Sequence, residues 1–112
     1  MEKGEQFNYL GYTIKMCTNN DGIVLLSPSG SHCGNYSEDV ELAKKFALIN
    51  YMLDKPELKA TCVNRLAGFN GYWGDYNLLK RLIEKDGLEM PSDIQCSNDV
   101  KDRNTNFMIV LN

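Results

Sequence analysis

The stretch that decides the fold is Leu10-Gly11-Tyr12-Thr13-Ile14-Lys15-Met16-Cys17. Its even-numbered residues are large and apolar, whereas its odd-numbered residues are smaller or polar. An alternation with a period of two is typical of a strand that buries one face. We therefore predict a strand that begins at Leu10.

The residues after this stretch predict a returning strand and a short third one. A turn over residues 19–22 ends in the Asp-Gly pair that favours tight hairpins, and the returning strand is expected over residues 23–26. A second turn over residues 27–30 leads into a third strand over residues 31–36. Gly34 weakens that strand and suits it to the edge of a sheet.

The middle of the chain has the periodicity of helices. The first helix is expected to start at the N-cap Ser37 and to end before Pro56. Its apolar stripe consists of Leu42, Phe46, Ile49 and Leu53. A second helix is expected from Pro56 to Gly68, and a third between its cap Asp75 and its stop Gly87, with Leu78, Leu79, Leu82 and Ile83 turned inward.

The C-terminal part predicts a loop and a last strand. Residues 88–106 are polar and lack a period, so we expect a mobile loop there. Residues 107–111 are apolar throughout, which predicts a strand buried on both faces. The expected order is thus β-β-(β)-α-α-α-β over a single domain, residues 1–112. We predict a two-layer α+β fold, in which one mostly antiparallel sheet joins the N-terminal hairpin to the C-terminal strand, and about three helices cover one face.

Composition and charge narrow the classes of function. The chain has 112 residues, of which 43% are hydrophobic and 24% charged, as in an average globular protein. Its net charge of -3 argues against a dedicated duplex nucleic-acid binder. No signal peptide and no long apolar run is evident, so we expect a soluble cytoplasmic protein without a membrane partner.

The thiols and the histidine do not form a recognisable catalytic or metal-binding motif. The four cysteines are irregularly spaced, which favours free thiols over two disulfides. His32 and Cys33 could form a nucleophile and its base, but neighbours on a strand point to opposite faces. We therefore expect no enzyme, no catalytic residue, no metal and no cofactor.

The segment Phe69-Asn70-Gly71-Tyr72-Trp73-Gly74-Asp75-Tyr76 is the candidate for binding, because it gathers four aromatic rings and two glycines. Tyrosine and tryptophan are over-represented at binding hot spots. The candidate partner-binding residues are Phe69, Tyr72, Trp73, Tyr76, Arg81 and Lys85. A second interpretation stays open, in which the rings plug the core of the domain.

The first fifty residues resemble, in general style, the short ββ(β)α units of small phage and mobile-element proteins, including the DNA-binding arms of some integrases. The features that carry this resemblance are the strand at residues 11–14, the two turns and the acid-led helix with Ala43-Lys44-Lys45-Phe46. It covers less than half of the chain and brings no functional motif.

This resemblance implies an accessory protein that binds and inhibits a host macromolecule, as anti-CRISPR proteins do. We accordingly expect a non-enzymatic protein-interaction domain, either a monomer or a homodimer. The alternative is weak binding of single-stranded nucleic acid through aromatic stacking.

Overall fold

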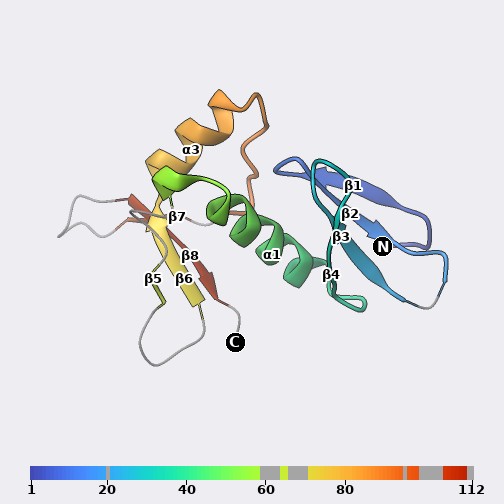
Figure 1. Ribbon diagram of the computed structural model, residues 1–112. Coiled ribbons are helices and arrows are strands. Elements are labelled where there is room, and N and C mark those ends of the chain that lie inside the picture. The colour runs from blue at the N-terminus through green and yellow to red at the C-terminus, as the bar shows by residue number, and fades with distance from the viewer. Residues whose placement is uncertain (20, 59–63, 66–70, 95, 99–104, 111–112) are drawn as a thin grey trace. The chain divides into compact units, whose positions relative to one another are not determined.

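Figure 1 shows the computed structural model of the chain, which describes residues 1–19, 21–58, 64–65, 71–94, 96–98 and 105–110. The chain divides into two compact units, Met1–Ile49 and Asn50–Asn112. Helix α1 (Val40–Leu53) runs through the boundary between them. The α+β class is confirmed, whereas the single-domain organisation stays a prediction. None of the described helices has the length and apolarity needed to cross a membrane.

The unit Met1–Ile49 is built on a four-stranded antiparallel sheet in the order β1-β2-β3-β4 (Figure 1). The strands are β1 (Gln6–Tyr9), β2 (Tyr12–Met16), β3 (Ile23–Leu26) and β4 (His32–Asn35). The returning strand and the third strand at the sheet edge are confirmed. Strand β1 was not predicted, because only four residues carry its alternation.

The first predicted strand begins two residues later than expected. Leu10 and Gly11 form the turn of the β1–β2 hairpin, in which Tyr9 and Tyr12 are register partners. Both turn residues have positive φ angles, 56° and 85°, as a type I′ turn requires. A leucine rarely adopts this conformation, and its burial to 4% exposure offsets the strain. The alternation therefore correctly predicted that Leu10 is buried, although the residue lies in a turn and not in the strand.

Helix α1 covers one face of this sheet (Figure 1). The face turned to the helix contributes the fully buried Ile14, Ile23 and Leu25, and the helix contributes Ala43 and Ala47. Burial of these side chains removes apolar surface from water, which is the main stabilising term of a fold of this size.

The start and the end of α1 differ from the prediction. Asp39, not Ser37, is the N-cap, because its Oδ1 accepts a hydrogen bond of 3.0 Å from the backbone of Leu42. The carbonyl of Ser37 is instead engaged with the sheet through a 2.6 Å hydrogen bond from the backbone of Ile23. Leu53 is 45% exposed, since the helix ends at this residue, so it does not belong to the buried stripe.

Three ring contacts fix α1 to the rest of Met1–Ile49. The Nζ atom of Lys44 lies 5.8 Å from the ring centroids of both Phe7 and Tyr9. The ring of Phe46 stacks on Tyr36, with centroids 5.1 Å apart. Each contact stabilises the fold by about 0.5 to 1 kcal/mol in addition to the burial of apolar surface. The helix is thus attached both to β1 and to the segment after β4.

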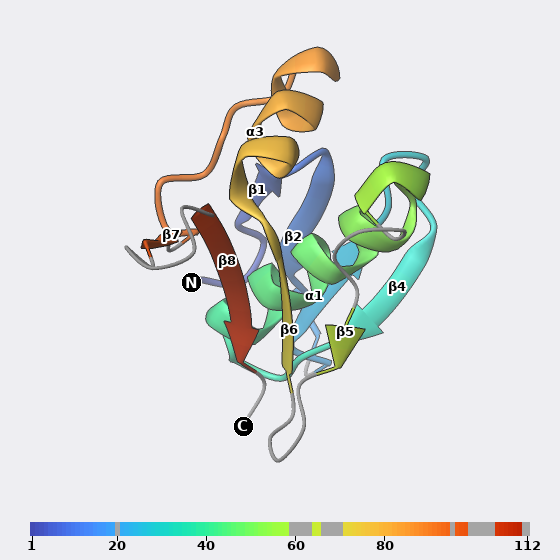
Figure 2. The same cartoon turned by 90° about the vertical axis from the view of Figure 1, so that its left-hand side faces the viewer.

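The unit Asn50–Asn112 contains a second antiparallel sheet, in the order β5-β6-β8-β7, with β6 between β5 and β8 (Figure 2). The strands are β5 (Asn64–Arg65), β6 (Gly71–Asp75), β7 (Cys96–Asn98) and β8 (Thr105–Val110). The prediction that the last strand joins the N-terminal hairpin in one sheet is therefore wrong. Strand β8 pairs with β6, which arises from the aromatic segment, and with β7, which arises from the predicted loop.

Residues 88–106 were predicted to form a loop without regular structure. This prediction is wrong at β7, which is a strand. Phe107 and Ile109 of β8 are buried, and they lie on one face of the strand. The side chains of Met108 and Val110 lie outside the described residues, so burial of both faces stays a prediction. Residues 56–58 are helical, but residues 64–65 form strand β5, so the predicted second helix is wrong at those two residues. Its other residues, with Gly68, lie outside the described residues.

Helix α3 (Tyr76–Lys85) confirms the predicted caps. The side chain of Asp75 accepts a hydrogen bond of 3.1 Å from the backbone of Leu78. At the other end, the backbone of Gly87 donates to Glu84 and that of Leu88 donates to Ile83, which is the Schellman pattern of a helix end. The buried residues of the helix are Leu79, Leu82 and Ile83, and α3 packs on β6 and β8.

A polar cluster of Tyr51, Lys55 and Asp86 connects the end of α1 to the end of α3. The Tyr51 hydroxyl donates a 2.7 Å hydrogen bond to Oδ2 of Asp86, and Lys55 forms an ion pair with the same oxygen. These contacts, that of Lys55 first, lower the pKa of the Asp86 carboxyl, whereas burial and the bond to Asp86 raise the pKa of Tyr51. A carboxylate is unfavourable at a helix C-terminus, and the two partners offset this cost.

We expect Asp86→Asn to lower the free energy of unfolding by about 1 kcal/mol at neutral pH. Because the folded state lowers the pKa of Asp86, its contribution is present above the unfolded pKa of about 3.9 and disappears as the pH falls through the folded value. The difference in Tm between Asp86→Asn and the native protein should therefore shrink between pH 7 and pH 3. Glu89→Gln, at an exposed carboxylate, is the control and should show no such dependence.

Candidate interaction surface

The strand β6 places Tyr72 on the covered face of its sheet. Tyr72 is opposite Ile109, and Gly74 is opposite Phe107, on neighbouring β8. Cross-strand partners point to the same side of a sheet, and both partners on β8 are buried. Tyr72 itself is half-buried. This position favours the core interpretation for Tyr72.

The other aromatic candidates are placed less completely. The backbone of Trp73 lies in β6, with Asn64 and Met108 as its register partners, and its side chain lies outside the described residues. Phe69 lies outside the described residues altogether. Tyr76 is the first residue of α3 and is half-buried. Of the four rings, Tyr76 is thus the one that the structure places beside an exposed surface.

Helix α3 carries an exposed side that is mostly cationic. The side opposite the buried leucines consists of the exposed residues Asn77, Lys80, Arg81, Glu84 and Lys85. Three of these five residues are cations and one is an acid. This excess of positive charge occurs in a chain whose net charge is -3.

The geometry of the helix separates the predicted site residues into two rows. Arg81 and Lys85 are four residues apart and share one row. Tyr76 is about 140° from Arg81 around the helix axis, and shares the other row with Lys80. Lys80 is therefore a further candidate residue for this surface that was not among the predicted ones, and its four-residue spacing from Tyr76 is the signal that identifies it. We call the exposed Lys80, Arg81 and Lys85, together with the half-buried Tyr76, the cationic side of α3.

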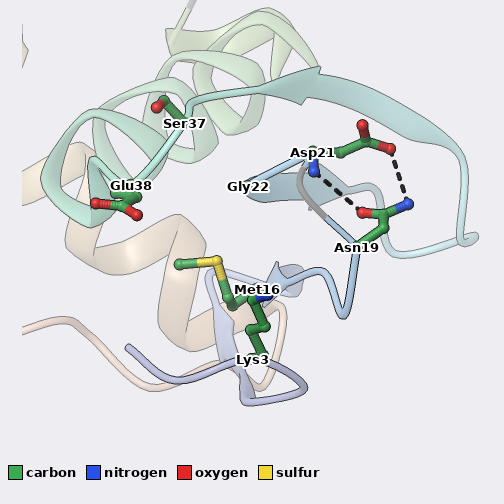
Figure 3. Close-up of a pocket in the computed structure, with 7 residues that line it drawn as sticks. All are labelled: Lys3, Met16, Asn19, Asp21, Gly22, Ser37 and Glu38. Carbon is green, nitrogen blue, oxygen red and sulfur yellow. Dashed lines mark hydrogen bonds between the residues drawn. The ribbon is translucent and has the colours of Figure 1, made fainter.

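A pocket of about 310 Å³ lies in the other unit, Met1–Ile49 (Figure 3). Its lining consists of Lys3, Met16, Asn19, Asp21, Gly22, Ser37 and Glu38. Small-molecule sites are mostly apolar and enclosed, whereas Met16 is the apolar side chain of this lining and the charged groups are exposed. Asn19 and Asp21 also satisfy each other through hydrogen bonds of 2.9 and 3.1 Å (Figure 3).

The pocket owes its shape to a close backbone approach between Gly22 and Ser37. Both residues have positive φ angles, 78° and 53°. A β-carbon at Gly22 would overlap the carbonyl group of Ser37, with 2.9 Å to its carbon atom. The same carbonyl accepts the hydrogen bond from Ile23. The close approach of Gly22 and Ser37 thus holds the start of α1 on the sheet. This role explains why both residues keep strained φ angles.

His32 and Cys33 are not hydrogen-bonded to each other, since each has a different hydrogen-bond partner. The Nε2 atom of His32 is hydrogen-bonded to Oδ1 of Asn35, and the Cys33 thiol donates to the carbonyl of Ser31 at 3.6 Å. Both residues are exposed on β4. Cys17 and Cys33 are free thiols. Cys62, and the side chain of Cys96, lie outside the described residues.

Among the described residues, no group of three or more His, Cys, Asp or Glu side chains is placed to hold a metal ion. No family model, no curated protein and no solved structure matches this chain. The choice of the cationic side of α3 as the candidate surface therefore rests on the type and exposure of its own residues.

We expect Gly22→Ala to lower the free energy of unfolding by about 2 kcal/mol or more, because it combines an unfavourable φ with the overlap at Ser37. Gly30→Ala is the matched control. Its φ is also positive, at 90°, but a β-carbon there meets nothing within 4 Å. Its loss should be about 1 kcal/mol. Equal losses in urea denaturation would contradict the role of the Gly22–Ser37 approach.

Proposed function

We propose that this protein is a non-enzymatic interaction module that docks on a larger protein and inhibits it. The observation that carries the proposal is the cationic side of α3, where Lys80, Arg81 and Lys85 are all exposed and Tyr76 stands at the start of the helix. Arginine and tyrosine are enriched among hot-spot residues. The surface therefore combines the residue types that carry binding energy with a charge opposite to that of the chain.

The helix is rigid enough to present these side chains in fixed positions. Its inner side is anchored by three buried residues, and both of its ends are capped. A side chain on a fixed helix loses less freedom on binding than one on a loop, which favours affinity. Folding thus already orders the backbone of this surface, and the side chains alone remain to be ordered on binding.

The partner surface is expected to be acidic and to belong to a protein. Arg81 and Lys85 can contact carboxylates four residues apart on a helix or in an acidic loop. Glu84 lies on the same exposed side, and the exposed Asp75 caps the helix start. A continuous polyanion would meet these two carboxylates, whereas a protein can present separate acidic groups. The sharpest form of the proposal is an anti-CRISPR-like inhibitor from a phage or mobile element, which rests on the resemblance of the first fifty residues.

A direct test replaces Tyr76 or Arg81 by a photo-crosslinking amino acid and identifies the captured protein from the cells that carry the gene. We expect Arg81→Glu with Lys85→Glu to lower the affinity for that protein by about tenfold or more. Tyr76→Ala should lower it as well. The control is Lys3→Glu with Lys45→Glu, which makes the same change in net charge within Met1–Ile49. Equal affinities of the two double variants, measured by calorimetry, would exclude the cationic side of α3 as the docking surface.

Weak binding of single-stranded nucleic acid is the second candidate, because the same cations could follow a phosphate backbone. It predicts a mobility shift with single-stranded DNA or RNA that weakens steeply with salt and is lost in Arg81→Glu with Lys85→Glu. The absence of a shift at low salt would remove this candidate and leave the protein partner.

A further inference from the structure

The face of the β1–β4 sheet that α1 does not cover carries two ordered rows of side chains. The strand registers place Gln6, Lys15, Val24 and Asn35 in one row, and Asn8, Thr13, Leu26 and His32 in the next. Register partners share a face, so the two rows form one surface, which we call the open face. None of its eight residues is buried. The core residues of β2 and β3 occupy the opposite face.

A β-bulge gives the open face its fourth column. The register between β3 and β4 shifts after Leu25, so that Leu25 is opposite Gly34 but Leu26 is opposite His32, and Cys33 is the extra residue. In a regular strand His32 and Asn35 would point to opposite faces, because they are three residues apart. Their hydrogen bond shows that they share one. The bulge has therefore moved His32 from the covered side to the open face, as bulges at sheet edges do where they re-aim a side chain.

The open face has the composition of a binding surface. Val24 and Leu26 form an apolar centre on β3 and are half-buried. Polar side chains flank them on both sides, and four of these are already paired. The Thr13 hydroxyl donates to Oδ1 of Asn8 at 3.4 Å, and His32 is hydrogen-bonded to Asn35. Protein interfaces have this arrangement of an apolar centre within a polar rim.

The charge of the open face selects the class of partner. Lys15 is its one formally charged residue, and none of the eight is an acid. The acidic residues of Met1–Ile49 lie outside the four strands, at Glu2, Glu5, Asp21, Glu38, Asp39 and Glu41. An anionic group is therefore attracted to Lys15 without repulsion from this face. Nucleic acid is disfavoured, because a single lysine neutralises one phosphate at most and the open face holds no Phe, Tyr or Trp ring for stacking.

We propose that the open face is a second docking surface, for a protein segment that places an apolar side chain on Val24 and Leu26 and a carboxylate at Lys15. The amides of Gln6, Asn8 and Asn35 offer hydrogen bonds to its backbone. This surface belongs to Met1–Ile49, and it uses no residue of α3. It stands whether or not the cationic side of α3 binds a partner.

The test selects peptides from a random displayed library on the full chain carrying Arg81→Glu and Lys85→Glu, so that two of the three exposed cations of α3 are replaced by acids. The enriched peptides are expected to combine a large apolar residue with a neighbouring aspartate or glutamate. Leu26→Asp and Lys15→Glu should each weaken the binding of the selected peptides at least tenfold.

Matched controls lie on α1 and are not among the eight residues of the open face. Leu53→Asp also places an acid at a partly exposed leucine, and Lys45→Glu also reverses a lysine, so both should leave binding unchanged. Should Leu26→Asp fail to fold, His32→Ala with Asn35→Ala removes two exposed side chains of the same surface and is expected to weaken binding at least threefold.

Three results would overturn the proposal. The first is a library that yields no enriched peptide. The second is enriched peptides that bind the open-face variants and the native surface equally well. The third is peptides that depend on Leu26 but carry no acid, which would contradict the class of partner. Failure of α3 to bind a protein in the crosslinking experiment affects none of these outcomes.

Discussion

The antiparallel pairing of β2 with β3 is the interaction on which the rest of Met1–Ile49 depends. It places Ile14 beside Leu25 on one face and Lys15 beside Val24 on the other. A slip of one residue would exchange the two faces of a strand, which would bury a lysine and expose a core isoleucine. The register is therefore held by burial, and the same register that makes the core also composes the open face.

The same constraint of backbone pairing explains the architecture of Asn50–Asn112. A buried strand needs hydrogen-bond partners along both edges, and β8 finds them in β6 and β7. The aromatic segment thereby becomes part of a sheet. Gly74 is opposite Phe107, which is fully buried. Gly71 and Gly74, which suggested a binding loop, thus both lie in the strand β6.

Both candidate surfaces follow one physical pattern. Each is the outer side of an element whose inner side is fixed in a core, the helix α3 in one unit and the sheet β1–β4 in the other. Each also carries a charge pattern that departs from the acidic chain, with three cations on α3 and an acid-free sheet face. Such local departures attract anionic groups, although the negative net charge of the whole chain does not indicate this attraction.

Local chemistry allowed the prediction of a good part of the fold. The strands at residues 23–26 and 31–36 and the capped third helix were predicted, because alternation, turn pairs and caps act within a few residues. Strand β1 and the cap Asp39 were missed, the first because it is short and the second because the sheet engages the carbonyl of Ser37. Arg81 and Lys85 were predicted as site residues and lie exposed on α3, but their separation from Tyr76 follows from the helix, not from their closeness in sequence.

What the sequence by itself determined is therefore the α+β class, the β2 and β3 strands and the limits of α3, since these depend on neighbours along the chain. Only the tertiary structure decided which strands share a sheet. It also decided that the final strand pairs with the aromatic segment and that a bulge at Cys33 brings His32 to the open face. The physical reason is that strand pairing joins residues far apart in sequence. A register or a bulge is defined by hydrogen bonds to the partner strand, and no local pattern records them.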